Sequence, residues 1–224
     1  FPYTTLFRSQ ATGAFLLGAG ERRTIGFATP LPWETPITVI NGQALLNLAV
    51  GVRTEVAVGP ELDRGDLHGI FVHPLPVQER ILAAFATLGF ALRQAGVQAG
   101  RLPGVRQSLP FHQKIGFWAA PLYAGPIGEV ELTFLTDSRG VEVILWLDRR
   151  LALAGAGHFS ISRFWVGHDR ATGPEGEDEA TWVSLVDGWL REALRRHAVA
   201  ASGQGLPVAP PPPMAGRPVH HPEP

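Results

Sequence analysis

Two alternating runs joined by a polar turn constrain the fold of this chain more than any other feature. Residues 129–136 and 141–148 each alternate apolar with mostly polar side chains, and residues 137–140 separate them. A period of two is the spacing of a strand with one buried face, and a short turn between two such runs predicts an antiparallel hairpin. The second run also carries Ile144 and Trp146 on its other face, which predicts that both faces are covered. We therefore expect a mainly β protein.

Two other stretches have the spacing of amphipathic helices. One begins at Pro76, which suits a first helical turn, and stops at Gly89, with apolar side chains recurring every three or four positions between them. The other covers residues 178–199 and places Trp182 and Trp189 on its apolar face. Core packing is the favoured role of these tryptophans, although such rings can also anchor a partner or lie at a membrane interface.

The composition limits the classes of partner. The net charge is −1 and charged residues make up 17% of the chain, whereas nucleic acid or an anionic membrane requires a strong basic surplus. There is no cysteine, so disulfides and thiolate metal sites play no part. No apolar run reaches the roughly 20 residues that a membrane-spanning helix needs. We therefore expect a cytoplasmic protein with no integral membrane segment and no nucleic-acid partner.

The two ends of the sequence differ from the rest. Residues 1–9 differ in character from the remainder of the chain and are interpreted as a non-native leader. The only methionine is Met214, so the sequence is expected to be a fragment that lacks its N-terminal part. Residues 201–224 are rich in proline and hold almost nothing to bury. A disordered tail is therefore expected there.

Asp63, Asp66, His68 and His73 are the strongest candidates for chemistry. Carboxylates and imidazoles at short spacing can bind a divalent metal. However, the sequence shows no His-x-x-x-His spacing, no Gly-x-Ser-x-Gly elbow and no phosphate-binding loop. A solvated linker between domains is the favoured interpretation, and a metal-dependent enzyme using this interdomain segment is the alternative.

Several stretches, in order along residues 20–198, together resemble the bacterial sporulation-control protein family with an arrestin-like fold, and its actinobacterial branch in particular. They are "TPLPWETPIT", "GVRTEVAV", "DRGDLHGIFVHPLPVQERIL", "LGFALRQA", "LPFHQKIGFW", "YAGPIGEVELTFLTDSRGVEVILWLDRR" and the tryptophan-rich last helix. Each stretch is weak evidence alone, but their shared order makes the resemblance specific.

The resemblance implies two arrestin-like β-sandwich domains. Residues 10–70 would be the C-terminal part of a truncated first sandwich, and residues 71–170 the second sandwich with one short helix. The amphipathic helix of residues 178–199 would come after it. The family also implies a non-catalytic cytoplasmic regulator or adaptor in sporulation or developmental control, with no cofactor and no enzymatic activity.

An adaptor of this kind would act through contacts with proteins that the sequence does not identify, and a homodimer formed through a sheet edge is a further expectation. The predicted contact residues are Trp33 and Glu34 in the proline-rich loop, Asp63 and Asp66 in the linker, and Trp182 and Trp189 on the last helix. Another alternative is an envelope or stress factor of the same fold whose last helix touches lipid.

Overall fold

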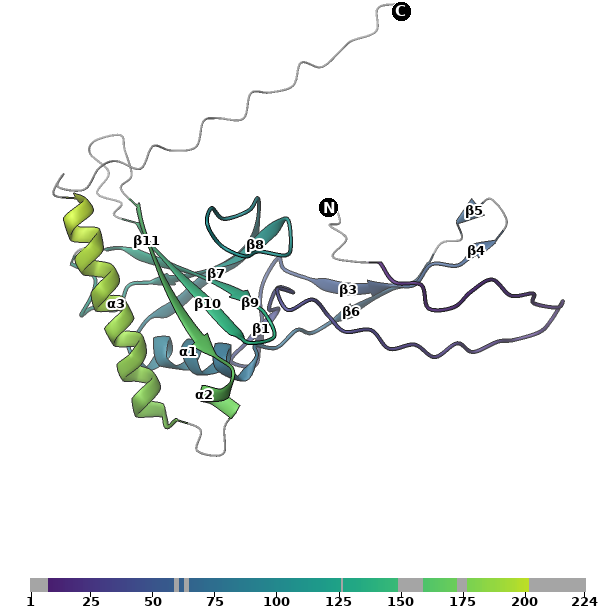
Figure 1. Ribbon diagram of the computed structural model, residues 1–224, viewed down its shortest axis with the longest axis horizontal. Helices are drawn as coiled ribbons and strands as arrows, with labels where there is room; N and C mark the ends of the chain where they lie inside the picture. Colours follow the sequence, from purple (N-terminus) through teal and green to yellow (C-terminus); the bar gives the residue numbers. More distant parts are fainter. Residues whose placement is uncertain are drawn as a thin grey trace, which may run out of the picture.

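A computed structural model describes residues 8–58, 61–62, 65–125, 127–148, 159–172 and 177–201. Its centre is a five-stranded antiparallel sheet with the strand order β11-β10-β9-β8-β7 (Figure 1). The strands are β7 (Ala91–Ala99), β8 (Phe111–Trp118), β9 (Glu129–Thr136), β10 (Gly140–Asp148) and β11 (Phe159–Gly167). Each strand pairs with the next one along the chain, so the sheet is a simple meander.

The predicted hairpin is confirmed as β9 and β10. Leu132 lies opposite Leu145 in the register, and both side chains are fully buried. Asp137 closes the turn, because its Oδ1 accepts the backbone N–H of Arg139 at 2.8 Å and that of Gly140 at 3.2 Å. The hydrogen bond from the Arg139 amide is also the main cause that lowers the pKa of the Asp137 carboxyl.

Helices α1 (Pro76–Thr87) and α3 (Glu179–Ala201) cover one face of the sheet and pack against each other, with the short α2 (Asp169–Thr172) nearby (Figure 1). The side chain of Gln78 accepts the backbone N–H of Leu75 at 2.9 Å and so caps the start of α1. Gly89 ends that helix with a φ of 87°, a conformation that a residue with a Cβ adopts only under strain. Both predicted helices are confirmed.

Part of the other face of the sheet is covered by the loop between β7 and β8. Leu102 from this loop packs with Leu135 and Ile144 from the sheet. Gln107 organises the loop from inside: its Oε1 accepts the Leu102 N–H at 2.9 Å, and its Nε2 donates to three backbone carbonyls. The expectation that both faces are covered is therefore confirmed around Ile144, whereas Trp165 on the same face is 61% exposed.

The described residues before α1 form six short strands. They are β1 (Val39–Ile40), β2 (Gln43–Ala44), β3 (Val50–Arg53), β4 (Ala57–Val58), β5 (Glu61–Leu62) and β6 (Leu67–Ile70), paired as β1-β2, β3-β6 and β4-β5. The described residues of the range 46–71, which we call the arm, project away from the five-stranded sheet and its helices (Figure 1). Ile37 and Ile40 instead lie in the same core cluster as α1, α3 and the sheet.

The mainly β fold class is confirmed. The division into two sandwich domains stays a prediction. Within the described part of residues 71–170 there is one sheet, and α1 and α3 occupy the place that a second sheet takes in a sandwich. Residues 1–7 of the expected leader and residues 202–224 of the expected tail lie outside the described residues.

Candidate functional site

The predicted contact residues Trp33 and Glu34 lie where the chain passes between the arm and the sheet. We call residues 32–38 and Val72 the junction. The carbonyl of Pro32 accepts the backbone N–H of Thr35 at 3.0 Å and its hydroxyl at 2.7 Å. Proline fixes φ and favours such turns. This tight turn presents the side chains of the two residues inside it.

Glu34 binds the loop that covers the outer face of the sheet. Its carboxylate accepts the Ser108 N–H at 2.9 and 3.0 Å and the Leu109 N–H at 2.9 Å. Hydrogen bonds to a charged acceptor are stronger than those between neutral groups. Glu34 therefore fixes the position of the junction relative to residues 107–109.

Trp33, the other residue in this turn, packs against His168. Its indole stacks on His168, with 5.5 Å between the ring centroids and 27° between the planes. The imidazole is itself fixed, since Nε2 donates to the carbonyl of Asp137 at 2.8 Å. The Trp33 residue is nevertheless 51% exposed. The junction thus presents a large aromatic ring in a fixed orientation at the surface.

The remaining contacts of the junction reach the core. Gln113 of β8 binds both backbone groups of Ile37: Oε1 accepts its N–H at 2.9 Å, and Nε2 donates to its carbonyl at 2.8 Å. Thr38 donates its N–H to the carbonyl of Val72 at 2.8 Å and accepts the Val72 N–H through its hydroxyl at 2.8 Å. The segments that lead into and out of the arm are therefore tied together beside the sheet.

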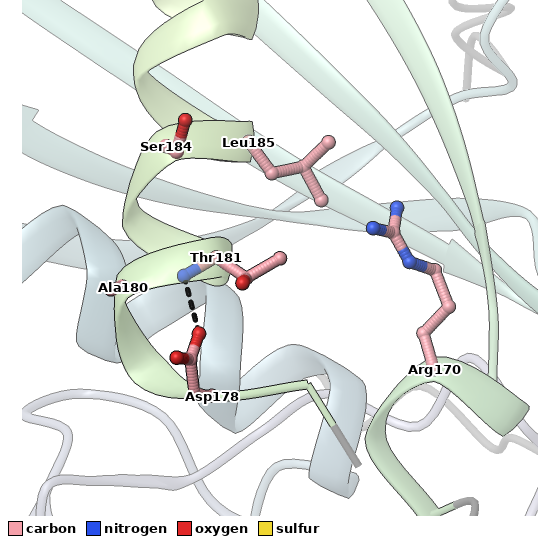
Figure 2. Close-up of a pocket in the computed structure, with 6 residues that line it drawn as sticks. All are labelled: Arg170, Asp178, Ala180, Thr181, Ser184 and Leu185. Carbon is pink, nitrogen blue, oxygen red and sulfur yellow. Dashed lines mark hydrogen bonds between the residues drawn. The ribbon is translucent and has the colours of Figure 1, made fainter. Parts of the chain in front are cut away.

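A separate hollow of about 470 Å³ lies at the start of α3 and includes Arg170, Asp178 and Thr181 in its lining (Figure 2). Asp178 accepts the backbone N–H of Thr181 at 2.8 Å, and its hydrogen bonds with Thr181 lower its pKa. The guanidinium of Arg170 binds the carboxylate of Glu177 and lies 5.7 Å from the Trp182 ring centre. These polar groups serve the helix start and its packing, so the hollow shows no set of groups directed at a ligand.

The predicted metal cluster is only partly described. Asp66 and His68 lie on the arm with 3.5 Å between Oδ2 and Nε2, and both side chains are exposed. His73 lies beyond the arm and is exposed as well, while Asp63 is outside the described residues. Within the ranges that the structure describes, no group of three or more His, Asp or Glu side chains is placed to hold a metal ion. The metal-dependent alternative stays a prediction.

The structure buries the two predicted contact residues of the last helix. Trp182 is 1% exposed and Trp189 is 8% exposed. Trp189 stacks on Phe164 of β11, with 5.1 Å between ring centroids. Both side chains belong to the main core cluster. This is the packing role that the sequence favoured, and a role of the two rings in partner contacts stays a prediction.

Three participants of the junction were not predicted from the sequence: His168, the backbone amides of residues 108–109, and Gln113. His168 belongs to no sequence motif, and a backbone amide leaves no signal in the sequence.

Among the helices described, none is long and apolar enough to cross a membrane.

Comparison with known proteins gives consistent matches. Residues 3–151 match the family described as SpoOM protein. The sporulation-control protein spo0M of Bacillus subtilis (strain 168) is 35% identical over 149 residues, which are 66% of this chain and 55% of that protein. The crystal structure of Spo0M, sporulation control protein, from Bacillus subtilis matches with a TM-score of 0.58 at 28% identity, over 75% of this chain and 67% of that chain. The sequence match thus spans about half of the curated relative. The family match, however, covers about two thirds of this chain, and the chain therefore belongs to the SpoOM protein family.

Proposed function

We propose that this protein is a non-catalytic cytoplasmic regulator that acts in sporulation or developmental control by binding other proteins. Its similarity to a sporulation-control protein supports a regulatory role in sporulation. The observation that carries a contact-based mechanism is the ring of Trp33, which is half-exposed and yet held in one orientation.

A fixed, exposed indole is well suited to bind a protein. Tryptophan is enriched among the few residues that dominate the energy of protein interfaces. A side chain that is already ordered loses little conformational entropy when a partner binds. Here the stack on His168 orders the ring, and the carboxylate of Glu34 orders the turn that carries it. The junction therefore meets both conditions for an anchor residue.

Exposed apolar side chains on the arm support the same proposal. Leu46 is 84% exposed, Leu67 is 51% exposed and Phe71 is 74% exposed. Large apolar side chains that gather at a surface are typical of sites that contact another macromolecule. The carboxylate of Asp66, on the same arm, is 82% exposed and would add charge to this surface. We propose that the arm and the junction together form the contact surface.

The proposal is tested by cross-linking capture from sporulating cells of the native host. The bait is the whole chain, either unchanged or with Trp33→Ala, Glu34→Gln or Trp165→Ala. Trp165 is 61% exposed on β11 and controls for the loss of an exposed indole elsewhere. We expect a small set of proteins to be captured by the unchanged chain and by Trp165→Ala, to be lost with Trp33→Ala, and to be reduced with Glu34→Gln.

Circular dichroism of each variant establishes that the fold is retained. Capture of the same proteins in equal amount by Trp33→Ala would contradict the proposed contact surface.

A further inference from the structure

Strand β7 forms one edge of the five-stranded sheet, and beyond a bulge near its start it lacks the features that usually protect such an edge. It pairs with β8 on one side, and no described strand pairs with its other side. An unpaired edge presents a row of backbone N–H and C=O groups, which proteins normally guard with lysine, proline, inward charges or very short strands. β7 has nine residues, "ALRQAGVQA", with neither lysine nor proline.

The single charge on β7 is already neutralised. Arg93 donates to Glu129 of β9 at 2.7 Å, and its guanidinium lies 4.9 Å from the ring centre of Trp118. The apolar side chains are only partly covered: Leu92 is 40% exposed and Val97 is 43% exposed. A bulge between Leu92 and Gln94 shortens the regular part of the strand to residues 94–99. This part is a neutral, extended edge with an apolar rim.

We propose that β7 pairs with β7 of a second copy of this chain, antiparallel and about a two-fold axis at Gly96. In this register Ala95 lies opposite Val97 of the second copy, and Gln94 lies opposite Gln98. Directly opposed residues point to the same face of a sheet. Ala95 lies opposite the buried Ile115 and packs on the core, so the first pair extends the apolar face.

The charges and the space along the edge are also compatible with this pairing. Arg93 would lie opposite Ala99 of the second copy, so no like charges face each other. Gln94 and Gln98 can exchange side-chain amide hydrogen bonds on the outer face. A Cβ built on Gly96 meets no atom within 4 Å, so the centre of the contact is open. Because the axis stands perpendicular to the sheet, the dimer would have one continuous ten-stranded sheet with the helices of both copies on the same face.

The absence of cysteine from the chain provides a direct test. Opposed residues in antiparallel strands have Cα atoms roughly 4.5–5.5 Å apart, which is within the range for a disulfide. In Gly96→Cys the two thiols would face each other across the axis. We expect this full-length variant to form a covalent dimer under mild oxidation, visible on a non-reducing gel. Ser184→Cys, on the exposed side of α3, is the matched control and should stay uncross-linked.

A second test does not depend on a cysteine. Light scattering after size-exclusion chromatography should show a dimer for the unchanged chain, and Val97→Lys should raise the dimer dissociation constant by about tenfold or more, because it places a charge on the edge. Leu122→Lys is the control, since Leu122 is 75% exposed in the loop before β9, and it should remain dimeric. Thermal unfolding establishes that both variants keep their fold.

The outcomes separate clearly. A monomer at every concentration, or a dimer that Val97→Lys does not weaken, would overturn the proposal. A covalent dimer of Val97→Cys in place of Gly96→Cys would overturn the register. These experiments do not test Trp33, so they can refute the dimer without contradicting the proposed contact surface.

Discussion

Replacing Tyr123 by phenylalanine should change both the stability of the protein and its dependence on pH. Tyr123 lies in the loop between β8 and β9 and is 3% exposed. Its hydroxyl donates to Oδ1 of Asp187 on α3, and Arg191 binds both oxygens of the same carboxylate at 3.0 and 2.8 Å. Burial, together with the neighbouring Asp187 carboxylate, raises the pKa of Tyr123 to about 12. The hydroxyl is therefore a neutral donor that ties this loop to the last helix.

The magnitude can be worked out from these contacts. A hydrogen bond to a charged group contributes about 1.5–3 kcal/mol, and Arg191 keeps Asp187 paired in Tyr123→Phe, so we expect a loss of about 2 kcal/mol at pH 7. For a chain of this size that corresponds to a Tm lower by about 4–8 °C. An unfolded tyrosine loses its proton near pH 10. Between pH 10 and about pH 12 the folded state keeps a proton that the unfolded state has lost, so this stabilisation is present below pH 10 and falls as the pH rises.

The assay is urea unfolding followed by tryptophan fluorescence at pH 7 and at several values between pH 9 and pH 12. Both proteins carry Tyr3→Phe, because the chain has only two tyrosines and Tyr123 is then the only phenol that titrates. The difference in unfolding free energy between the two proteins should shrink from about 2 kcal/mol towards zero across the alkaline range. A difference that stays constant from pH 7 to pH 12 would refute the reasoning, as would a phenol that titrates near pH 10 in the folded protein.

Three further changes test other parts of the fold. Phe85→Ala removes a fully buried ring that α1 packs against the sheet and should cost about 3–5 kcal/mol in urea unfolding; a loss below about 1 kcal/mol would contradict that placement. Gln107→Ala removes four hydrogen bonds inside the loop over the outer face, so stability should fall by about 2–4 kcal/mol and amide exchange should quicken in that loop first. Gly89→Ala adds a Cβ at a position with left-handed backbone conformation and should lower the free energy of unfolding by about 1 kcal/mol. An unchanged urea midpoint would show that α1 ends differently.

The parts of the fold that the sequence predicted depend on local periodicity. The hairpin of β9 and β10 and both amphipathic helices appear within a few residues of their expected positions, because each buries one face and the spacing of apolar residues records it. The burial of Trp182 was predicted for the same reason. The sequence predicted that Ile144 would be covered, but it did not identify the loop that covers it. Leu102 reaches Ile144 because Gln107 holds the loop between β7 and β8 in its conformation through hydrogen bonds.

The junction could be predicted only in part. Trp33 and Glu34 were identified as surface candidates, but the partners of Glu34 are backbone amides 74 and 75 positions later in the chain, and no side chain marks them. The predicted boundary between domains, the linker around Asp63 and Asp66, rests on local composition alone. Composition does not record tertiary contacts. Ile37 and Ile40 precede that boundary in the chain, yet they pack in the core formed by the residues after it.

The hydrogen bonds around Thr38 have a consequence for how proteins of this kind can diversify. The carbonyl of Thr38 accepts the Leu45 N–H at 2.8 Å, and its N–H binds the carbonyl of Val72 at the same distance. The arm therefore leaves and returns at one point, and none of its described residues belongs to the core clusters of the sheet. Closing a longer loop costs little extra entropy, so this segment can be lengthened, shortened or exchanged with small effect on the rest. It is a natural site for grafting, where a new recognition element can be inserted into an unchanged scaffold.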